Sequence, residues 1–406
     1  MADETAVRRS GRGRMILVAS LLVAVAVAVA VVVWWIERPP PDPLEPDPVS
    51  LPESTPRYIA LGDSYSAGEG LRPFHTDTVD IDQRGDRCHR SDRAYPPQLK
   101  FDPSVTVEFR ACSGAKVEHL YAAVQKHSNR PVFSGLQAAG HLSEDVGLVT
   151  LTMGGNDVAF SNALVFCAAL QRRYCLDDPF QIAHQRFASL DAFADKALQD
   201  VAAVLPLAYD ELRSDAPNAR IIVVGYPNLF SEQPTRASRC ALYTRLFGAR
   251  ERQDLNELGL RLNRVIEQTT ITAGLEFVDI SHVFAGHETC GRDGAWLQFL
   301  GEDLRFQDGN FHPNRAGQRM IARTVACYLT ITERPDLSTT EPTSTAPVPP
   351  ADESTADLGR TISDETNGDL GDSVYDCAIG AETPDPLDRN NPPVAEAQPY
   401  PSSPDS

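Results

Sequence analysis

Short apolar runs alternate with longer amphipathic stretches between residues 57 and 332. Brief, nearly continuous apolar runs bounded by Gly, Pro or polar residues are typical of buried strands. Apolar residues at helical spacing, with charges between them, are typical of helices that cover such strands. Strand and helix segments in alternation predict a parallel sheet covered by helices, with functional groups at the carboxyl ends of its strands. The predicted strands are Tyr58–Leu61, Val105–Phe109, Gly147–Thr152, Ile221–Val224 and Leu275–Ile280, and the predicted helices are Asp191–Leu212, Leu242–Thr272 and Asn314–Leu329.

The hydrophobic pattern is different at the N-terminus, where residues 15–36 form an uncharged apolar run. As a helix these residues would extend about 33 Å, enough to cross a hydrocarbon core of about 30 Å. Residues 1–14 carry four arginines, which favours a cytoplasmic N-terminus. A cleaved signal peptide is the alternative, but its apolar core is usually about 7–15 residues long. We therefore predict a transmembrane anchor, and both interpretations put the rest of the chain outside the cytoplasm.

Composition divides the remainder of the chain into three parts. Residues 37–56 are rich in proline and predict an extended stalk. Residues 57–332 carry a net charge of only −4 out of −19 for the chain, and they form the predicted folded domain. Residues 333–406 hold sixteen acids and three arginines with few large apolar residues, which predicts a disordered acidic tail. Nothing in this charge distribution suggests a nucleic-acid binder, and none is predicted.

Eight cysteines, none with the CxxC spacing of a zinc site, fit a protein exported to an oxidising compartment. Order along the chain suggests the disulfides Cys88–Cys112, Cys167–Cys175 and Cys240–Cys290, although spacing does not determine connectivity. Cys327 and Cys377 are left over and their state stays open; one interpretation of Cys327, within an apolar helical stretch, is a buried free thiol.

A serine follows the first predicted strand in the segment Tyr58–Gly70. Ser64 lies in a glycine-dotted turn, where the backbone can bend sharply and a substrate can approach closely. The alternative is that Ser64 merely caps a helix. Three later positions supply the other parts of an acyl-transfer site. Gly114 and Asn156 follow the second and third strands and, with the backbone N–H of Ser64, predict an oxyanion hole, while His312 before the last helix can accept the serine proton.

These positions resemble, in order, the four sequence blocks of the SGNH (GDSL) hydrolases: Gly62-Asp-Ser64, Gly114, Gly154-Gly-Asn156-Asp and His312. The cysteine layout resembles the disulfide-bonded, secreted bacterial esterase and lipase branch. The resemblance covers about residues 57–330. It implies a three-layer α/β/α, flavodoxin-like fold and ester hydrolysis without a cofactor. An α/β-hydrolase is disfavoured because the second glycine of Gly-x-Ser-x-Gly is missing: Ser66 stands there.

One position departs from the family pattern, which has an aspartate three residues before the histidine. Here that position is Gly309, and the nearest carboxylate is Asp308. The resemblance therefore leaves two interpretations: the Gly309 carbonyl orients His312 in a Ser64–His312 dyad, or Asp308 completes a triad. We favour the dyad, because a displacement of one residue in an extended segment points the Asp308 side chain elsewhere.

The sequence thus predicts a membrane-tethered, extracytoplasmic serine esterase or lipase, acting as a monomer on an ester or lipid. The first alternative is deacylation of a cell-envelope sugar or a phospholipid by the same residues. An alternative of another class is a non-catalytic surface binding module that kept the fold. No metal site is predicted, because no residues have a recognised ligand spacing.

Overall fold

The computed structural model describes residues 49, 51–75, 87–127, 130–131, 136–170, 174–235, 238–299, 309–332 and 370–379. The predicted basic segment and the predicted anchor, residues 15–36, lie outside them, as do Asp308 and most of the tail. Within the described ranges, no helix has both the length and the apolar character needed to cross a membrane.

Five parallel strands form the central sheet, in the order β2-β1-β5-β8-β9. Counted along the chain, these strands have the order 2-1-3-4-5, which is the flavodoxin-like arrangement. Every residue of β5, in the middle of the sheet, is buried. All five predicted strands are therefore confirmed within two residues at either end. Their bounds are β1 Arg57–Ala60, β2 Thr106–Phe109, β5 Val146–Leu151, β8 Arg220–Val224 and β9 Glu276–Val278.

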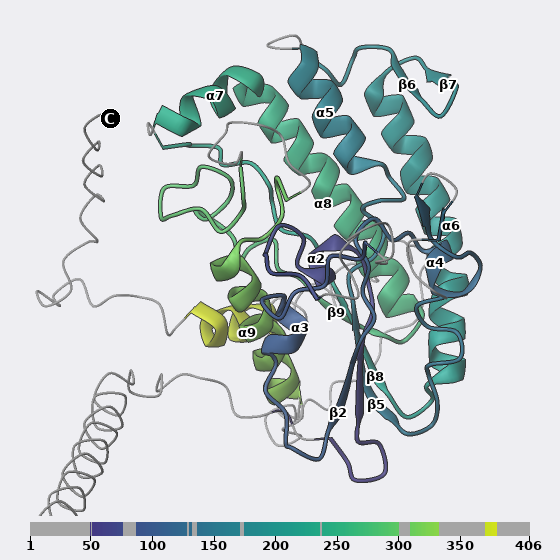
Figure 1. Cartoon of the computed structure of the whole chain (residues 1–406). Helices are drawn as coiled ribbons and strands as arrows, with labels where there is room; N and C mark the ends of the chain where they lie inside the picture. The colour runs from purple at the N-terminus through teal and green to yellow at the C-terminus, as the bar shows by residue number, and fades with distance from the viewer. Residues whose placement is uncertain are drawn as a thin grey trace, which may run out of the picture. The chain divides into compact units, whose positions relative to one another are not determined.

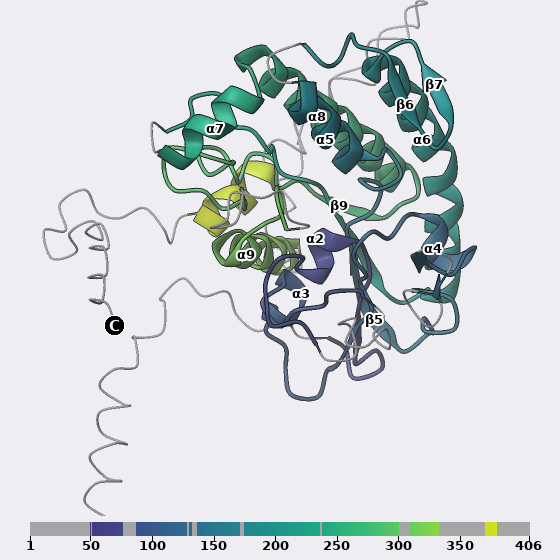
Figure 2. The ribbon, with the colours of Figure 1, turned by 45° about the horizontal axis from the view of Figure 1, so that its top comes forward.

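Helices cover both faces of the sheet, as Figures 1 and 2 show. Helices α3 (Tyr95–Gln98) and α9 (Arg315–Thr332) lie together on one face, and α6 (Leu190–Asp215) packs with α8 (Ala249–Thr272) on the other. The apolar stripes of α6 and α8 face inward, because Leu198, Leu205, Leu262 and Ile266 are buried. The predicted layers of helix, parallel sheet and helix are confirmed.

The predicted helix Leu242–Thr272 is two helices in the structure. Helix α7 (Ser238–Leu246) ends before Phe247, and α8 begins after Gly248. The Glu251 side chain accepts a hydrogen bond of 2.7 Å from the Gly248 N–H, which caps the new helix. The remaining described elements are short helices, one apolar helix and two hairpins: α2 Ser64–Ala67, α4 Glu118–Tyr121, α5 Phe160–Leu170, β3 Lys126–His127 with β4 Arg130–Pro131, and β6 Phe180–Ile182 with β7 Gln185–Phe187.

Disulfide bonds join all eight cysteines. Cys88–Cys112, Cys167–Cys175 and Cys240–Cys290 pair as their order suggests. The interpretation of Cys327 as a free thiol is wrong, because Cys327 in α9 pairs with Cys377.

Both ends of the predicted folded domain need correction. Upstream of residue 57, Val49 is buried and forms a bridge with Phe101, so part of the predicted stalk packs on the domain. Downstream, residues 370–379 are helical, with Val374 and Ala378 buried. The Cys327–Cys377 bond holds this segment, which was predicted to be disordered.

Candidate active site

A tight turn connects β1 to α2 and presents Ser64 at the first position of that helix. Gly62 has φ of +122°, and a Cβ there would lie 2.7 Å from the Thr152 carbonyl oxygen. Glycine is therefore required on both conformational and steric grounds. The Asp63 carboxylate caps α2 by accepting a hydrogen bond of 3.0 Å from the Tyr65 N–H. Asp63, and not Ser64, therefore caps α2, so the Ser64 hydroxyl is available for other contacts.

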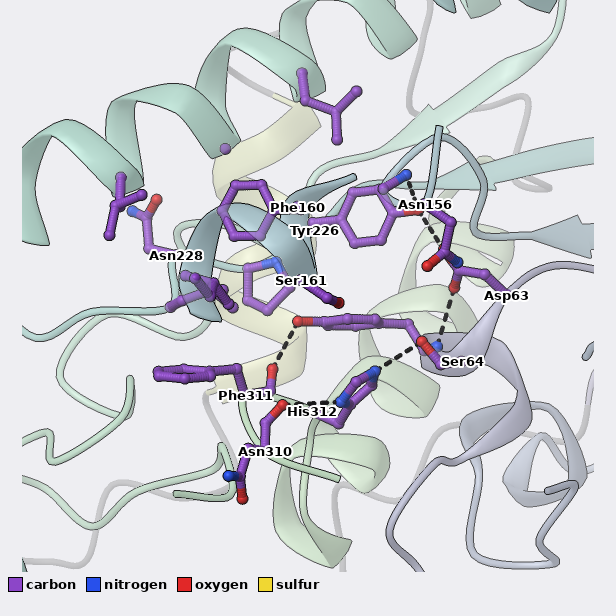
Figure 3. A pocket seen from close by; sticks show the side chains of 18 of the residues that line it. Asp63, Ser64, Asn156, Phe160, Ser161, Tyr226, Asn228, Asn310, Phe311 and His312 are labelled. Atoms are coloured by element: carbon purple, nitrogen blue, oxygen red, sulfur yellow. Dashed lines mark hydrogen bonds between the residues drawn. The ribbon is translucent and has the colours of Figure 1, made fainter. Parts of the chain in front are cut away.

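That hydroxyl lies against a histidine 248 residues later in the chain. His312 Nε2 is 2.7 Å from Ser64 Oγ, and Nδ1 is 3.0 Å from the Asn310 carbonyl oxygen (Figure 3). A carbonyl only accepts, so Nδ1 carries the proton and Nε2 is free to accept from the serine. The Gly309 carbonyl was expected in this orienting position, but it accepts from the His312 backbone N–H instead. Asp308 lies outside the described residues.

The two other predicted site residues lie beside this pair. Asn156 follows β5, and its side-chain amide donates a hydrogen bond of 3.0 Å to the Ala115 carbonyl oxygen. Gly114, with φ of +80°, lies in the turn that this bond fixes. Gly114 and Asn156 line one cleft together with Ser64 and His312. The fold therefore brings all four positions together from three loops at the carboxyl ends of β1, β2 and β5 and from the loop before α9.

A buried hydrogen-bond network below the turn was not predicted. Tyr226 donates a hydrogen bond of 2.6 Å to Asp63, and Thr152 donates one of 2.7 Å. The Tyr226 hydroxyl in turn accepts from the Gly155 N–H at 3.0 Å, beside Asn156. Burial raises the pKa of Asp63, while these hydrogen bonds partly offset that effect. The network joins the nucleophile turn to the Asn156 turn.

Two further contacts hold the parts of the site in register. The Tyr65 hydroxyl donates a hydrogen bond of 2.7 Å to the Phe311 carbonyl oxygen, and its ring centre lies 5.0 Å from that of His312. Asp157 accepts from the Val117 N–H at 3.2 Å through both carboxylate oxygens. Burial raises the pKa of Asp157 to about 7.

The cleft has two lobes that meet at Ser64. The apolar lobe is narrow, with a volume of about 60 Å³, and the wider lobe, lined by charged as well as apolar side chains, has a volume of about 800 Å³. Ser64, Asn156, Asn310 and His312 border both lobes. The apolar walls are visible in Figure 3 around Phe160, Tyr226 and Phe311, and Leu164, Leu229, Leu255 and Leu262 extend them. Among the described residues, no group of three His, Cys, Asp or Glu side chains is arranged to hold a metal ion.

Comparison with known proteins gives the family. Residues 60–320 match the model of the GDSL-like lipase/acylhydrolase family, in agreement with the resemblance of the four sequence blocks. The chain belongs to this family. The parallel sheet with helices on both faces is consistent with the fold of this family.

Curated relatives of this GDSL-like protein include two Streptomyces enzymes. Lipase 1 of Streptomyces coelicolor is 32% identical over 271 residues, which is 66% of this chain and 84% of the relative. A lipase of Streptomyces rimosus is 29% identical over 262 residues, 64% of this chain and 82% of the relative. With the family match, these relatives identify the chain as an ester hydrolase.

Two solved structures have a similar fold. An extracellular lipase from Streptomyces rimosus aligns with a TM-score of 0.50 at 25% identity and covers 68% of this chain and 98% of its own. A phospholipase A1 from Streptomyces albidoflavus aligns with a TM-score of 0.50 at 27% identity, covering 69% of this chain and 98% of its own. The similarity therefore spans the catalytic domain and leaves both ends of this chain unmatched.

Proposed function

We propose that this GDSL-like hydrolase is a membrane-tethered, extracytoplasmic serine esterase or lipase that uses a Ser64–His312 dyad. The observation that carries the proposal is the 2.7 Å contact between Ser64 Oγ and His312 Nε2. This distance suits direct proton transfer between a nucleophile and its base. The Asn310 carbonyl, 3.0 Å from Nδ1, supplies the orienting group in place of a carboxylate.

In the proposed reaction Ser64 Oγ attacks the ester carbonyl carbon while His312 Nε2 accepts the serine proton. His312 then gives this proton to the leaving alcohol as the ester C–O bond breaks, and an acyl-serine remains. A water molecule attacks the acyl carbon in the second half, with His312 again accepting and returning a proton.

Three donors are proposed to bind the negative oxygen that forms during each attack: the Ser64 N–H, the Gly114 N–H and the Asn156 side-chain amide. Donors fixed before the reaction stabilise developing charge without reorganising, and each is typically worth about 3–4 kcal/mol. The bond of Asn156 to Ala115 supports this assignment, because it fixes the direction of the amide.

The proposed location outside the cytoplasm is supported by the disulfide bonds and by the N-terminal sequence. Four disulfides fit an oxidising compartment. The apolar run of residues 15–36 after four arginines has the length and flanking charge of an anchor with its N-terminus in the cytoplasm.

A panel of p-nitrophenyl esters of graded acyl length, with acetylated sugars and phospholipids added, tests the activity. We expect the wild type to hydrolyse at least one ester, and Ser64→Ala to lower kcat/KM by at least roughly 10⁴-fold. Ser104→Ala, on the surface away from the cleft, is the matched control. Hydrolysis of none of the substrates would instead indicate a binding module that kept the fold.

A further inference from the structure

A glycine lies inside helix α8 at a position where the local structure does not require one. Gly259 has ordinary helical backbone angles, and beyond its own turn of helix no atom of the described residues would lie within 4 Å of a Cβ there. At Gly317 in α9, by contrast, a Cβ would lie 2.5 Å from the Trp296 carbonyl oxygen, so that glycine is needed for close packing. Glycine weakens a helix interior relative to alanine. The missing side chain at Gly259 therefore lowers the stability of α8 and needs another explanation.

Gly259 faces the apolar lobe of the cleft. Leu255 precedes it by four residues and Leu262 follows it by three, so the three positions lie on one face of α8. All three border the apolar lobe, and the two leucines are 0% and 3% exposed. Phe160 and Leu164 of α5 border the same lobe. Gly259 is thus a gap in an apolar wall, and a side chain there would extend into the lobe between the two leucines.

The same face of α8 gives the direction in which the lobe runs. Leu262 is at the catalytic end, because a Cβ at Gly154, two residues before Asn156, would lie 3.6 Å from Leu262 Cδ1. At about 1.5 Å per residue along the helix axis, Gly259 is about 4.5 Å and Leu255 about 10 Å beyond Leu262. A group that enters the lobe from the catalytic end therefore passes the gap before it reaches Leu255.

The acyl chain is the part of an ester that suits this lobe. It gains free energy by leaving water for apolar walls, and a lobe of about 60 Å³ has little room for a wider group. We propose that Gly259 sets the length of the acyl chain that the enzyme accepts. Short chains end before the gap, and longer chains occupy the space that a side chain at this position would fill. This inference rests on the proposed function of the same site and adds a residue that limits its substrates.

The p-nitrophenyl esters of acetic and octanoic acid test the inference. The measured quantity is the ratio of kcat/KM for the octanoyl ester to that for the acetyl ester, which we expect to be at least about one tenth in the wild type. Gly259→Ala should lower this ratio several-fold. Gly259→Leu, which fills more of the gap, should lower it at least about tenfold, the order of discrimination that one methylene gives in an apolar pocket. The butanoyl and hexanoyl esters locate the chain length at which the loss begins.

Gly371 provides the matched control. It is a helical glycine in the segment 370–379, a Cβ there would likewise have no atom of the described residues within 4 Å, and it lines neither lobe. Gly371→Ala and Gly371→Leu should keep the wild-type ratio. Thermal unfolding checks that the variants are folded: Gly259→Ala should unfold at or above the wild-type temperature, because alanine fits the helical backbone angles with less entropy to lose.

Acetate esters of 1-butanol and 1-octanol vary the alcohol part and tell which part of the ester enters the lobe. The Gly259 variants should hold the octyl-to-butyl ratio of kcat/KM near its wild-type value. A change confined to this alcohol series would overturn the inference, as would an unchanged acyl ratio in both Gly259 variants or a wild-type acyl ratio far below one tenth. Each of these results leaves the proposed function intact as long as Ser64→Ala abolishes hydrolysis of the acetyl ester. Failure of the wild type on every ester would instead reject the proposed function itself.

Discussion

At the scale of single residues, the proposed dyad depends on the orientation of one imidazole, that of His312. His312 accepts from the serine only when its other nitrogen is protonated, and the Asn310 carbonyl imposes that tautomer. A carbonyl dipole stabilises the imidazolium less than a carboxylate would, but it still accepts the Nδ1 hydrogen and orients the ring.

The dyad predicts that Asp308→Asn keeps most of the esterase activity, since the account assigns no catalytic role to this carboxylate. His312→Ala is the matched loss-of-function control. Steady-state kcat/KM on a soluble p-nitrophenyl ester is the measurement. A decrease of roughly 10⁴-fold for Asp308→Asn, as occurs when a triad acid is neutralised, would instead show a triad.

Asp157 gives a second prediction, on stability and pH. Burial raises its pKa from 3.8 to about 7, so the folded state binds this proton more tightly than the unfolded state. Its contribution to stability is therefore full below about pH 4 and is lost as the pH rises through 7. The Asp157→Asn variant has no such titration and does not lose this stability as the pH rises. The unfolding free energy of the variant minus that of the wild type should therefore increase by up to about 4 kcal/mol between pH 4 and 8.

Urea unfolding of both proteins at several pH values measures that difference, with the exposed Asp210→Asn as control. A difference that stays constant from pH 4 to 8 would show that the Asp157 pKa is not raised in the folded protein.

The sequence predicted Ser64, Gly114, Asn156 and His312, but not how Tyr65 and Tyr226 connect them. Tyr65 bonds a carbonyl 246 residues away, and Tyr226 bonds a carboxylate 163 residues away. Local spacing holds no information about such contacts. The only signal was the position of each tyrosine just past the carboxyl end of a predicted strand.

At the scale of elements, the hydrophobic pattern predicted those strands and helices whose sequences follow a regular period. The five strands of the sheet and the helices α6 and α9 follow directly from their apolar patterns. Helix α5, Phe160–Leu170, is apolar on nearly all sides, so it gave no helical periodicity. The break between α7 and α8 was missed because apolar and charged residues continue through Phe247 and Gly248 with the same spacing.

The helical segment 370–379 gives a prediction at this scale. It buries few side chains, chiefly Val374 and Ala378, and so short a helix is marginal by itself. We expect that replacing both Cys327 and Cys377 with serine releases it, so that limited proteolysis cuts around residue 370 at least about tenfold faster. Activity should persist, because the segment lines neither lobe of the cleft.

Wild type under oxidising conditions is the control for the proteolysis. Equal rates of cleavage in the two proteins would show that packing alone holds the segment.

At the scale of the whole molecule, the 2-1-3-4-5 strand order explains why distant residues meet. It puts β1 between β2 and β5, so the loops that carry Ser64, Gly114 and Asn156 lie side by side at one edge of the sheet. Helix α9 then follows the loop of His312. Strand–helix alternation predicted a parallel sheet with functional groups at the carboxyl ends of its strands, and the resemblance to the SGNH hydrolases implied the flavodoxin-like order. The start of the folded domain near Val49 depends on tertiary contacts instead.

The proposed tether predicts where the protein is found. When the full chain is expressed in a bacterium, it should sediment with membranes and resist extraction by high salt. A chain starting at residue 37, exported behind a cleavable signal peptide, should be soluble and keep its kcat/KM within about twofold. Fractionation and immunoblotting measure both. A full chain released as a shortened soluble protein would instead indicate a cleaved signal peptide.

The central claim is that Ser64 forms the acyl-enzyme with His312 as its base. The most direct measurement is peptide mass spectrometry after reaction with a p-nitrophenyl alkylphosphonate, which traps an activated serine covalently. The account predicts one adduct, on the peptide that contains Ser64, in wild type and in Asp308→Asn, and no adduct in His312→Ala. An adduct on another serine, or equal labelling of His312→Ala, would contradict it.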